Sequence, residues 1–150
     1  MPQNPFICKK VSFEAGHRLP HHHSKCKNLH GHHYELEVMI GGPLSLDQQS
    51  SSYGMVADFH DLKHILKKHI LEPWDHAFFV YEKDLELLNF LNSLPEHKTV
   101  VTPLPPTAEH LAQLAFNTLN QQMPQNWNLK IVRLYETPTC WAEVSNSLED

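Results

Sequence analysis

Three histidines of this sequence share a side-chain parity that can bring their imidazoles together. His30 and His32 lie two residues apart in the segment 30–40, where apolar and polar residues alternate as in a strand. His17 follows the strand-like segment 6–15 and has the parity of its apolar face. If the two strands pair as a hairpin, the three side chains meet above an apolar floor. Three neutral nitrogen donors with an open fourth position are typical of a catalytic zinc site, which this pattern therefore predicts.

The alternative for these positions is three partly exposed histidines with ordinary hydrogen bonds, and their shared parity favours the metal site. His33 has the opposite parity, so we do not expect it to be a ligand. The run His21-His22-His23 follows Pro20 in a loop. We interpret this run as solvated, with contact to an anionic ligand as the alternative.

Cys26 is the candidate for a reactive thiol. It lies between two lysines, four residues before His30. Two ammonium groups and a nearby zinc would favour the thiolate, the form that accepts a proton. The alternatives are an inert thiol or a fourth zinc ligand, which would close the site and make it structural. Cys8 and Cys140 lie in apolar strand patterns, so we expect them to be small core residues.

Several polar residues further along the chain could serve acid–base chemistry or ligand binding. Asp75 precedes His76, and a carboxylate beside an imidazole can build a general acid or base; an ordinary surface pair is the alternative. Glu136 shares its strand face with apolar residues, so its carboxylate could receive the amidine-like edge of a ligand ring; a salt bridge is the alternative. Thr107 and Glu109 open a predicted helix, as N-cap and as an acid favoured by the helix dipole.

The elements that must position these residues suggest an α+β domain. Four strands and three helices are predicted. Without the shorter middle helix their order is ββααββ, and we expect the helices on one face of a four-stranded antiparallel sheet. The strands are expected over 6–15, 30–40, 129–136 and 140–144, and the helices over 58–72, 85–94 and from Thr107 onward. Pro73 should stop the first helix. The chain has no internal repeat or long linker, so we expect one domain over residues 1–150.

Composition excludes several classes of function. The chain has 150 residues, of which 41% are hydrophobic, and its net charge of −5 argues against a protein that binds nucleic acid. No apolar run approaches the roughly 20 residues of a membrane span, and we expect no signal peptide. Three widely spaced cysteines argue against a disulfide framework and favour a cytoplasmic location.

Together these motifs resemble the 6-pyruvoyl-tetrahydropterin synthase / 6-carboxytetrahydropterin synthase family. The matching pieces occur in family order over nearly the whole chain: F-E-A-G-H-R-L-P at 13–20, K-C-K-N-L-H-G-H at 25–32, G-M-V-A-D-F at 54–59, D-H at 75–76, P-T-A-E at 106–109 and E-T at 136–137.

The resemblance implies the tunnelling fold, in which three protomers close a barrel and two such trimers stack into a hexamer. It also implies a role for each candidate residue. The zinc ligands would be His17, His30 and His32, and the proton acceptor would be Cys26. Asp75 and His76 would be the relay partners, and Glu136 would anchor the pterin; some descriptions also count Glu136 in the relay. Thr107 and Glu109 would line the pterin pocket.

The spacing around Cys26 distinguishes the branches of that family. The four-residue step from Cys26 to His30 resembles the bacterial branch, which makes 6-carboxy-5,6,7,8-tetrahydropterin for 7-deazaguanine (queuosine) synthesis. In the branch that forms 6-pyruvoyltetrahydropterin, this step is typically six residues. A branch that replaces the cysteine with glutamate is disfavoured because Cys26 is present. The segment 80–101 is longer than the compact bacterial pattern and leaves room for a different substrate.

The resulting hypothesis is a zinc-dependent lyase that acts on 7,8-dihydroneopterin triphosphate and releases acetaldehyde and triphosphate. 6-Pyruvoyltetrahydropterin synthase is the alternative within the family. A zinc hydrolase and a non-catalytic zinc- or pterin-binding module are alternatives from other classes. Arg18, Lys25 and Lys27 are candidate contacts of the triphosphate, with solvated charge as the alternative.

Overall fold

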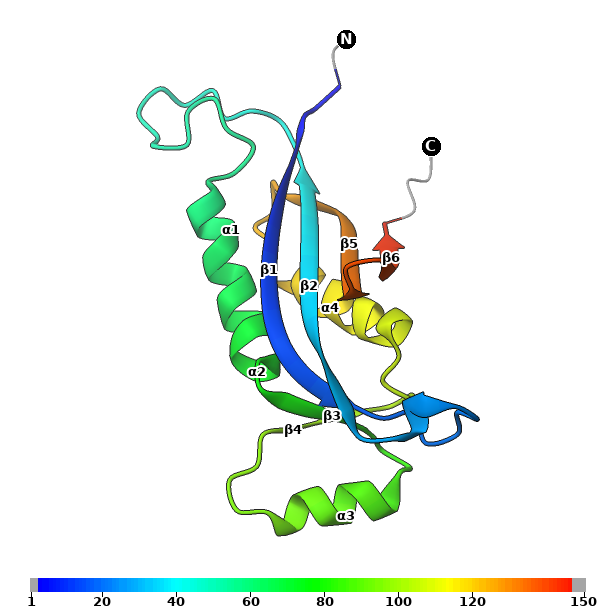
Figure 1. The fold of residues 1–150 in the computed structure, drawn as a ribbon. Coiled ribbons are helices and arrows are strands. Elements are labelled where there is room, and N and C mark those ends of the chain that lie inside the picture. The colour runs from blue at the N-terminus through cyan, green and yellow to red at the C-terminus, as the bar shows by residue number, and fades with distance from the viewer. Residues whose placement is uncertain (1–2, 147–150) are drawn as a thin grey trace.

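Two long paired strands form the centre of the structure (Figure 1). The computed structural model describes residues 3–146. In chain order its elements are β1 (Phe6–His17), η1 (Lys25–Lys27), β2 (His30–Gly41), α1 (Phe59–Leu66), the π-helical turn η2 (Lys67–Leu71), α2 (Glu72–Trp74), β3 (Ala77–Tyr81), α3 (Leu85–Ser93), β4 (Thr99–Thr102), α4 (Ala108–Gln122), β5 (Asn128–Thr137) and β6 (Cys140–Ser145). Within the described part of the chain, no helix has the length and apolar character of a membrane span.

The strands form one sheet in the order β4-β3-β1-β2-β5-β6. The predicted hairpin is present, because β1 and β2 pair antiparallel from Phe6 opposite Gly41 to His17 opposite His30. β2, β5 and β6 continue this antiparallel pairing. The predicted sheet of four antiparallel strands in ββααββ order is incomplete, however, since β3 and β4 add two parallel strands beside β1.

The two added strands are short, with five and four residues, and neither shows clear alternation. An apolar run of this length cannot be assigned to a strand or a helix by its period alone. Both lie in or beside the segment 80–101, which therefore folds as a strand, a helix and a second strand that extend the sheet.

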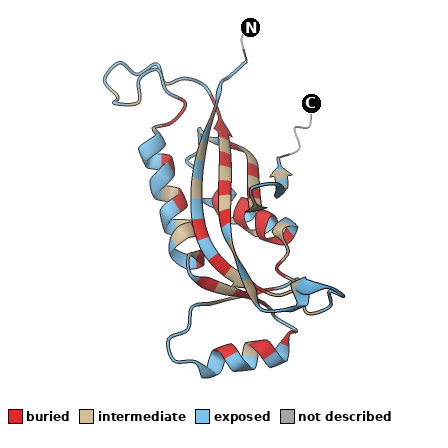
Figure 2. Ribbon diagram, in the orientation of Figure 1, coloured by how far each residue is buried: buried red, intermediate tan, exposed pale blue. Residues whose placement is uncertain are grey.

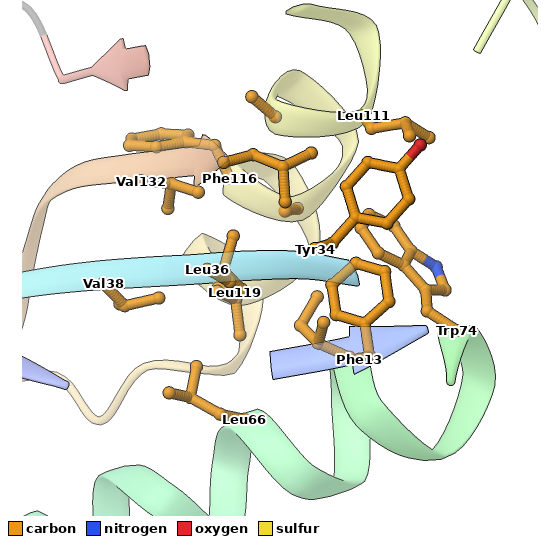
Figure 3. Packing of buried hydrophobic residues seen from close by; sticks show 14 of the residues in the cluster. Phe13, Tyr34, Leu36, Val38, Leu66, Trp74, Leu111, Phe116, Leu119 and Val132 are labelled. Atoms are coloured by element: carbon orange, nitrogen blue, oxygen red, sulfur yellow. The ribbon is translucent and has the colours of Figure 1, made fainter. Parts of the chain in front are cut away.

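The main core lies between the sheet and the helices α1 and α4. Buried residues alternate with more exposed ones along β2, as Figure 2 shows, and Tyr34, Leu36 and Val38 are fully buried. The rings of Phe13 and Tyr34 stack with their centroids 5.1 Å apart, and Trp74 packs edge-on against Phe13 (Figure 3). Aromatic pairs of this kind add about 0.5–1.5 kcal/mol beyond the area that they bury.

The helix α3 packs elsewhere, so the expectation that all helices cover one face is wrong for this element. Phe79 of β3 belongs to the main core, whereas its neighbour Val80 forms a second cluster with Leu87 and Leu91 of α3. Because neighbouring strand residues point to opposite faces, α3 covers the face of β3 that lies away from α1 and α4.

The predicted helix starts are confirmed, and one predicted helix end is displaced. Asp58 caps α1 by accepting a hydrogen bond from the His60 N–H at 2.8 Å. The helical path then continues past Pro73 to Trp74. A proline ring clashes with the carbonyl four residues earlier in a regular helix. The widened turn η2, just before Pro73, moves those carbonyls and lets the helix accept the proline.

Candidate active site and metal centre

The three predicted ligands converge at one end of the β1–β2 hairpin. His17 lies opposite His30 in the register, and the parity of His32 places it on the same face. The Nε2 atoms of His17 and His30 are 3.1 Å apart, and one ligand nitrogen from each of the three residues lies within 4.8 Å of the others. The parity argument therefore located a compact cluster of three imidazoles.

Main-chain carbonyls fix the orientation of two of these rings. The Nδ1 atom of His17 is 2.7 Å from the Pro106 carbonyl oxygen, and that of His30 is 2.7 Å from the Asn28 carbonyl oxygen. A carbonyl only accepts hydrogen bonds, so both Nδ1 atoms donate, and in the neutral rings Nε2 keeps its lone pair. Carbonyl bonds of this type are typical of histidines that bind metals.

The surroundings keep the cluster in the form that binds a cation. The side chain of His17 is 1% exposed, and burial lowers its pKa; burial also lowers the pKa of His32. Two neutral rings whose Nε2 lone pairs face each other at 3.1 Å repel unless a cation or proton lies between them. The donor set and its geometry therefore fit a metal ion with nitrogen ligands, such as zinc.

Tyr34 lies beneath the cluster and was missed as a site residue. Its ring centroid is 5.6 Å from that of His32 and 6.2 Å from that of His17. Its hydroxyl is buried without a hydrogen-bond partner among the described residues, and burial raises its pKa well above the usual range. The signal was present in the sequence, because Tyr34 continues the parity of His30 and His32.

Glu136 reaches the same cluster from β5. Its Oε1 atom is 3.5 Å from His17 Nε2 and 3.7 Å from His32 Nε2. Its side chain is partly exposed, so the carboxylate lies at the border between the imidazoles and solvent. It is therefore placed to contact both the cluster and a ligand that approaches from outside.

Cys26 lies in η1, within the loop that joins the two strands carrying the histidines. It is half-buried, and its carbonyl accepts a hydrogen bond from the Leu19 N–H at 2.7 Å, which closes the loop. Its sulfur does not join the group of converging ligand atoms. The structure thus gives no support to a fourth thiolate ligand.

Asp75 and His76 form a pair at the other edge of β1. The Nδ1 atom of His76 is 3.1 Å from the Asp75 carboxylate, which also accepts a hydrogen bond from the Glu14 N–H at 2.9 Å. The latter bond is the main cause of the lowered pKa of Asp75. No hydrogen bond or ion pair within residues 3–146 connects this pair to Cys26 or to the three imidazoles.

A hollow of about 380 Å³ lies beside His76, between the ends of β1 and β2. Glu14 and His33 line it, and their side chains pair with each other. This pairing agrees with the prediction that His33 is not a ligand. Gly16, which also lines the hollow, cannot be replaced easily, since a Cβ atom there would lie 2.5 Å from the ring of Phe78.

Thr107 and Glu109 occupy the first turn of α4, as expected. Thr107 is the N-cap, and its hydroxyl accepts a hydrogen bond from the His110 N–H at 3.1 Å. Glu109 is exposed in this turn. Because the carbonyl of Pro106 orients His17, the start of α4 is tied directly to the imidazole cluster.

Two other expectations need correction. Cys8 and Cys140 are exposed rather than buried in the core, because Cys8 lies on the outer side of β1 and Cys140 is the first residue of β6, beside the turn from β5. Arg18, a candidate triphosphate contact, is already engaged: its guanidinium donates two hydrogen bonds to the Asp84 carboxylate, at 2.6 and 2.7 Å. Lys25 and Lys27 are exposed.

Comparison with known proteins identifies the family of this chain. The family model for 6-pyruvoyl tetrahydropterin synthase matches residues 6–147. The chain belongs to this family. It is 41% identical to the 6-carboxy-5,6,7,8-tetrahydropterin synthase of Haemophilus influenzae over 140 residues, which covers 91% of this chain and 96% of that protein. The protein of the same name from Rickettsia conorii is 34% identical over 138 residues, with the same two coverages.

Solved structures show the same fold. An uncharacterized protein from Wolinella succinogenes superposes with a TM-score of 0.79 at 24% identity, covering 97% of this chain and 100% of that one. The 6-pyruvoyl tetrahydropterin synthase of Plasmodium falciparum gives a TM-score of 0.73 at 21% identity, covering 97% and 99% of the two chains. The fold of this chain is therefore shared, over nearly its whole length, with these two proteins.

Proposed function

We propose that this chain is a zinc-dependent lyase that converts 7,8-dihydroneopterin triphosphate to 6-carboxy-5,6,7,8-tetrahydropterin, with release of acetaldehyde and triphosphate. The observation that carries the proposal is the convergence of three imidazoles, two of them oriented by main-chain carbonyls, beside a loop that holds Cys26. The short step from Cys26 to His30 and the relatives named 6-carboxy-5,6,7,8-tetrahydropterin synthase support this product over the pyruvoyl compound.

His17, His30 and His32 would hold the zinc, which would supply Lewis-acid chemistry that makes C–H bonds of the substrate side chain more acidic. The Cys26 thiolate accepts a proton from the substrate side chain. The imidazolium of His76 returns a proton, while the Asp75 carboxylate holds the ring and stabilises its charged form. Unsaturation thereby moves from the ring to the side chain, triphosphate leaves by elimination, and carbon–carbon cleavage with the uptake of one water releases acetaldehyde and leaves a carboxyl group on the ring.

The remaining site residues position the pterin. The Glu136 carboxylate accepts hydrogen bonds from the amidine-like edge of the ring, in the bidentate manner that carboxylates favour. Thr107 and Glu109 line the pocket at the start of α4. Fixing the ring in this way aligns the reacting C–H bond with Cys26, so binding energy lowers the barrier through orientation.

The lack of a bond between Cys26 and the Asp75–His76 pair within residues 3–146 is explained if the site is completed between subunits. The edge strands β4 and β6 have unpaired backbone groups on their outer sides, which proteins rarely leave exposed. A cyclic trimer, or two stacked trimers, would pair these edges and bring Asp75 and His76 of one copy to Cys26 of another. Light scattering at micromolar concentration should find this assembly, and a monomer would contradict it.

The three free thiols also fit the reducing cytoplasm as the location of this protein.

The activity is tested by incubating the protein with 7,8-dihydroneopterin triphosphate and identifying the products by mass spectrometry. The proposal expects 6-carboxy-5,6,7,8-tetrahydropterin together with acetaldehyde and triphosphate. Formation of 6-pyruvoyltetrahydropterin instead would assign the chain to the other branch. Tight binding of the substrate without any product would identify a non-catalytic pterin-binding module.

A further inference from the structure

Lys98 holds the main chain on both sides of His76. It directly precedes β4, at the end of the segment that extends the sheet. Its carbonyl oxygen accepts a hydrogen bond from the Phe78 N–H at 3.0 Å, and its Nζ atom donates one to the Asp75 carbonyl oxygen at 2.5 Å. A single residue therefore connects to the residue before His76 and to the second residue after it.

The backbone at His76 requires such support. Its φ angle is +62°, in the left-handed region that residues other than glycine rarely adopt. The Glu14 main chain supplies part of the support, because its carbonyl accepts a hydrogen bond from the His76 N–H at 2.6 Å. These bonds determine where the imidazole projects, because the direction of a side chain follows from the conformation of its backbone.

We propose that Lys98 is a positioning residue of this enzyme, whose ammonium group fixes the Asp75–His76 turn and thereby the place of the imidazole that returns the proton. The inference rests on the proposed function for the role of that imidazole. Through Lys98, the segment 80–101 would position a residue of the site in addition to extending the sheet.

The contacts of Lys98 indicate that it acts through the turn and not on the substrate. His76 lines the hollow beside β1 and β2, whereas Lys98 does not. The positive charge of Lys98 also contributes to the lowered pKa of Asp75, after the larger effects of the Glu14 N–H and of His76. Lys98 therefore supports both the position of the His76 imidazole and the ionised state of the carboxylate that contacts it.

The test compares three variants of the full chain. Lys98→Met removes the ammonium group but keeps the side-chain volume and the main-chain bond to Phe78. Lys98→Arg restores a cationic donor of similar reach. Lys83→Met is the matched control, because Lys83 is an exposed lysine of the same segment.

The first measurement is steady-state turnover of 7,8-dihydroneopterin triphosphate. Losing the net free energy of a hydrogen bond of this kind changes a rate constant by about three- to tenfold. Lys98→Met should therefore lower kcat by about that factor, with little change in KM. Lys98→Arg should recover most of the loss, and Lys83→Met should match the wild type. Equal kcat for Lys98→Met and Lys83→Met, or no recovery by arginine, would overturn the assignment.

The second measurement is hydrogen exchange by mass spectrometry over a peptide that spans residues 74–79. This measurement does not depend on enzymatic turnover. Exchange should be several-fold faster in Lys98→Met and unchanged in Lys83→Met, while zinc content and Tm stay near the wild-type values. Unchanged exchange would show that Lys98 does not fix the turn. If the wild-type chain forms no product, the proposed function fails, and the exchange comparison still decides the role of Lys98.

Discussion

The imidazole cluster and the Asp75–His76 turn use the same side chain in opposite surroundings. The side chain of His17 is 1% exposed, whereas that of His76 is 76% exposed. In the cluster, carbonyls hold the rings themselves, while at the turn most of the hydrogen bonds hold the main chain. The cluster is thus complete within one chain, whereas the turn presents an imidazole to whatever approaches from outside.

This difference separates two tasks of an active site. A metal centre needs several donors at fixed mutual distances, which the register of a single hairpin can supply. A proton donor must meet the substrate and recover its proton from solvent, so exposure suits it. Changes in the two regions should therefore have different signatures.

The largest effect is expected from removing one ligand of the cluster. His32→Ala should lose most of the bound zinc and nearly all turnover, because two imidazoles make a poor zinc site. His33→Ala, one residue away on the opposite face, should keep its zinc. Metal analysis after gel filtration measures both variants. Full zinc occupancy in His32→Ala would disprove the ligand assignment.

Cys26→Ala should separate chemistry from metal binding. A general base typically contributes about 10²- to 10⁴-fold, so turnover should fall by at least this order. Zinc content and pterin affinity should remain, because the three imidazoles and Glu136 are unchanged. Cys8→Ala and Cys140→Ala serve as controls, because both thiols are exposed and neither belongs to the loop of Cys26. Loss of zinc in Cys26→Ala would instead identify a structural ligand.

Asp75→Asn should have a smaller effect, confined to the turn. The amide oxygen can still accept the hydrogen bond from the Glu14 N–H, but the charge that stabilises the His76 imidazolium is lost. Hydrogen bonds to charged groups are worth about 1.5–3 kcal/mol, which predicts a fall in kcat of about 10- to 100-fold. Zinc content should not change. Wild-type kcat in this variant would exclude Asp75 from the relay.

As the pH is lowered, the metal-free protein should lose stability first through protonation of the imidazole cluster. The pKa of His17 is lowered by burial in the folded state, so its neutral ring contributes stability above the unfolded value of 6.5. That stability is lost as the pH falls below 6.5 toward the lowered pKa, by at most about 1.4 kcal/mol per pH unit for one group. Asp75, whose pKa is also lowered, responds only below its usual value of 3.8. Tm of the metal-free protein should therefore decline as the pH falls below 6.5. A constant Tm over this range would contradict the buried, neutral state of His17.

The sequence predicted the cluster well because strand parity is a local and rigid rule. His17, His30 and His32 needed only the alternation of two strands and their pairing as a hairpin. The family and the lyase activity followed from motifs and agree with the comparisons. The N-caps Asp58 and Thr107 were also predicted correctly, because capping depends on one side chain and the next few main-chain N–H groups.

What the sequence could not show depends on contacts between distant parts of the chain. β3 and β4 are strands because β1 offers them an edge, and nothing in five apolar residues specifies that partner. Glu14 and Lys98 hold the Asp75–His76 turn through hydrogen bonds that each include a main-chain group, and no pattern in the sequence indicates which main chain the Lys98 ammonium group will contact. Cys8 was misplaced because its apolar neighbours point to the other side of β1, and Cys140 because it lies at the exposed start of β6.

The widened turn η2 has a consequence for how this chain tolerates insertions and deletions. A π-helical turn holds about one residue more than a regular turn over the same span. Deleting one residue from Lys67–Leu71 should let the helix close into uniform α geometry, so its length would hardly change. Everything that follows would keep its phase, because the regular turn completes the same rotation with one residue fewer, and Trp74 would still face Phe13. The cost would fall on Pro73, because regular α geometry brings its ring against the carbonyl four residues earlier. Deleting a residue from the regular α1 would instead rotate everything that follows by about 100° around the helix axis.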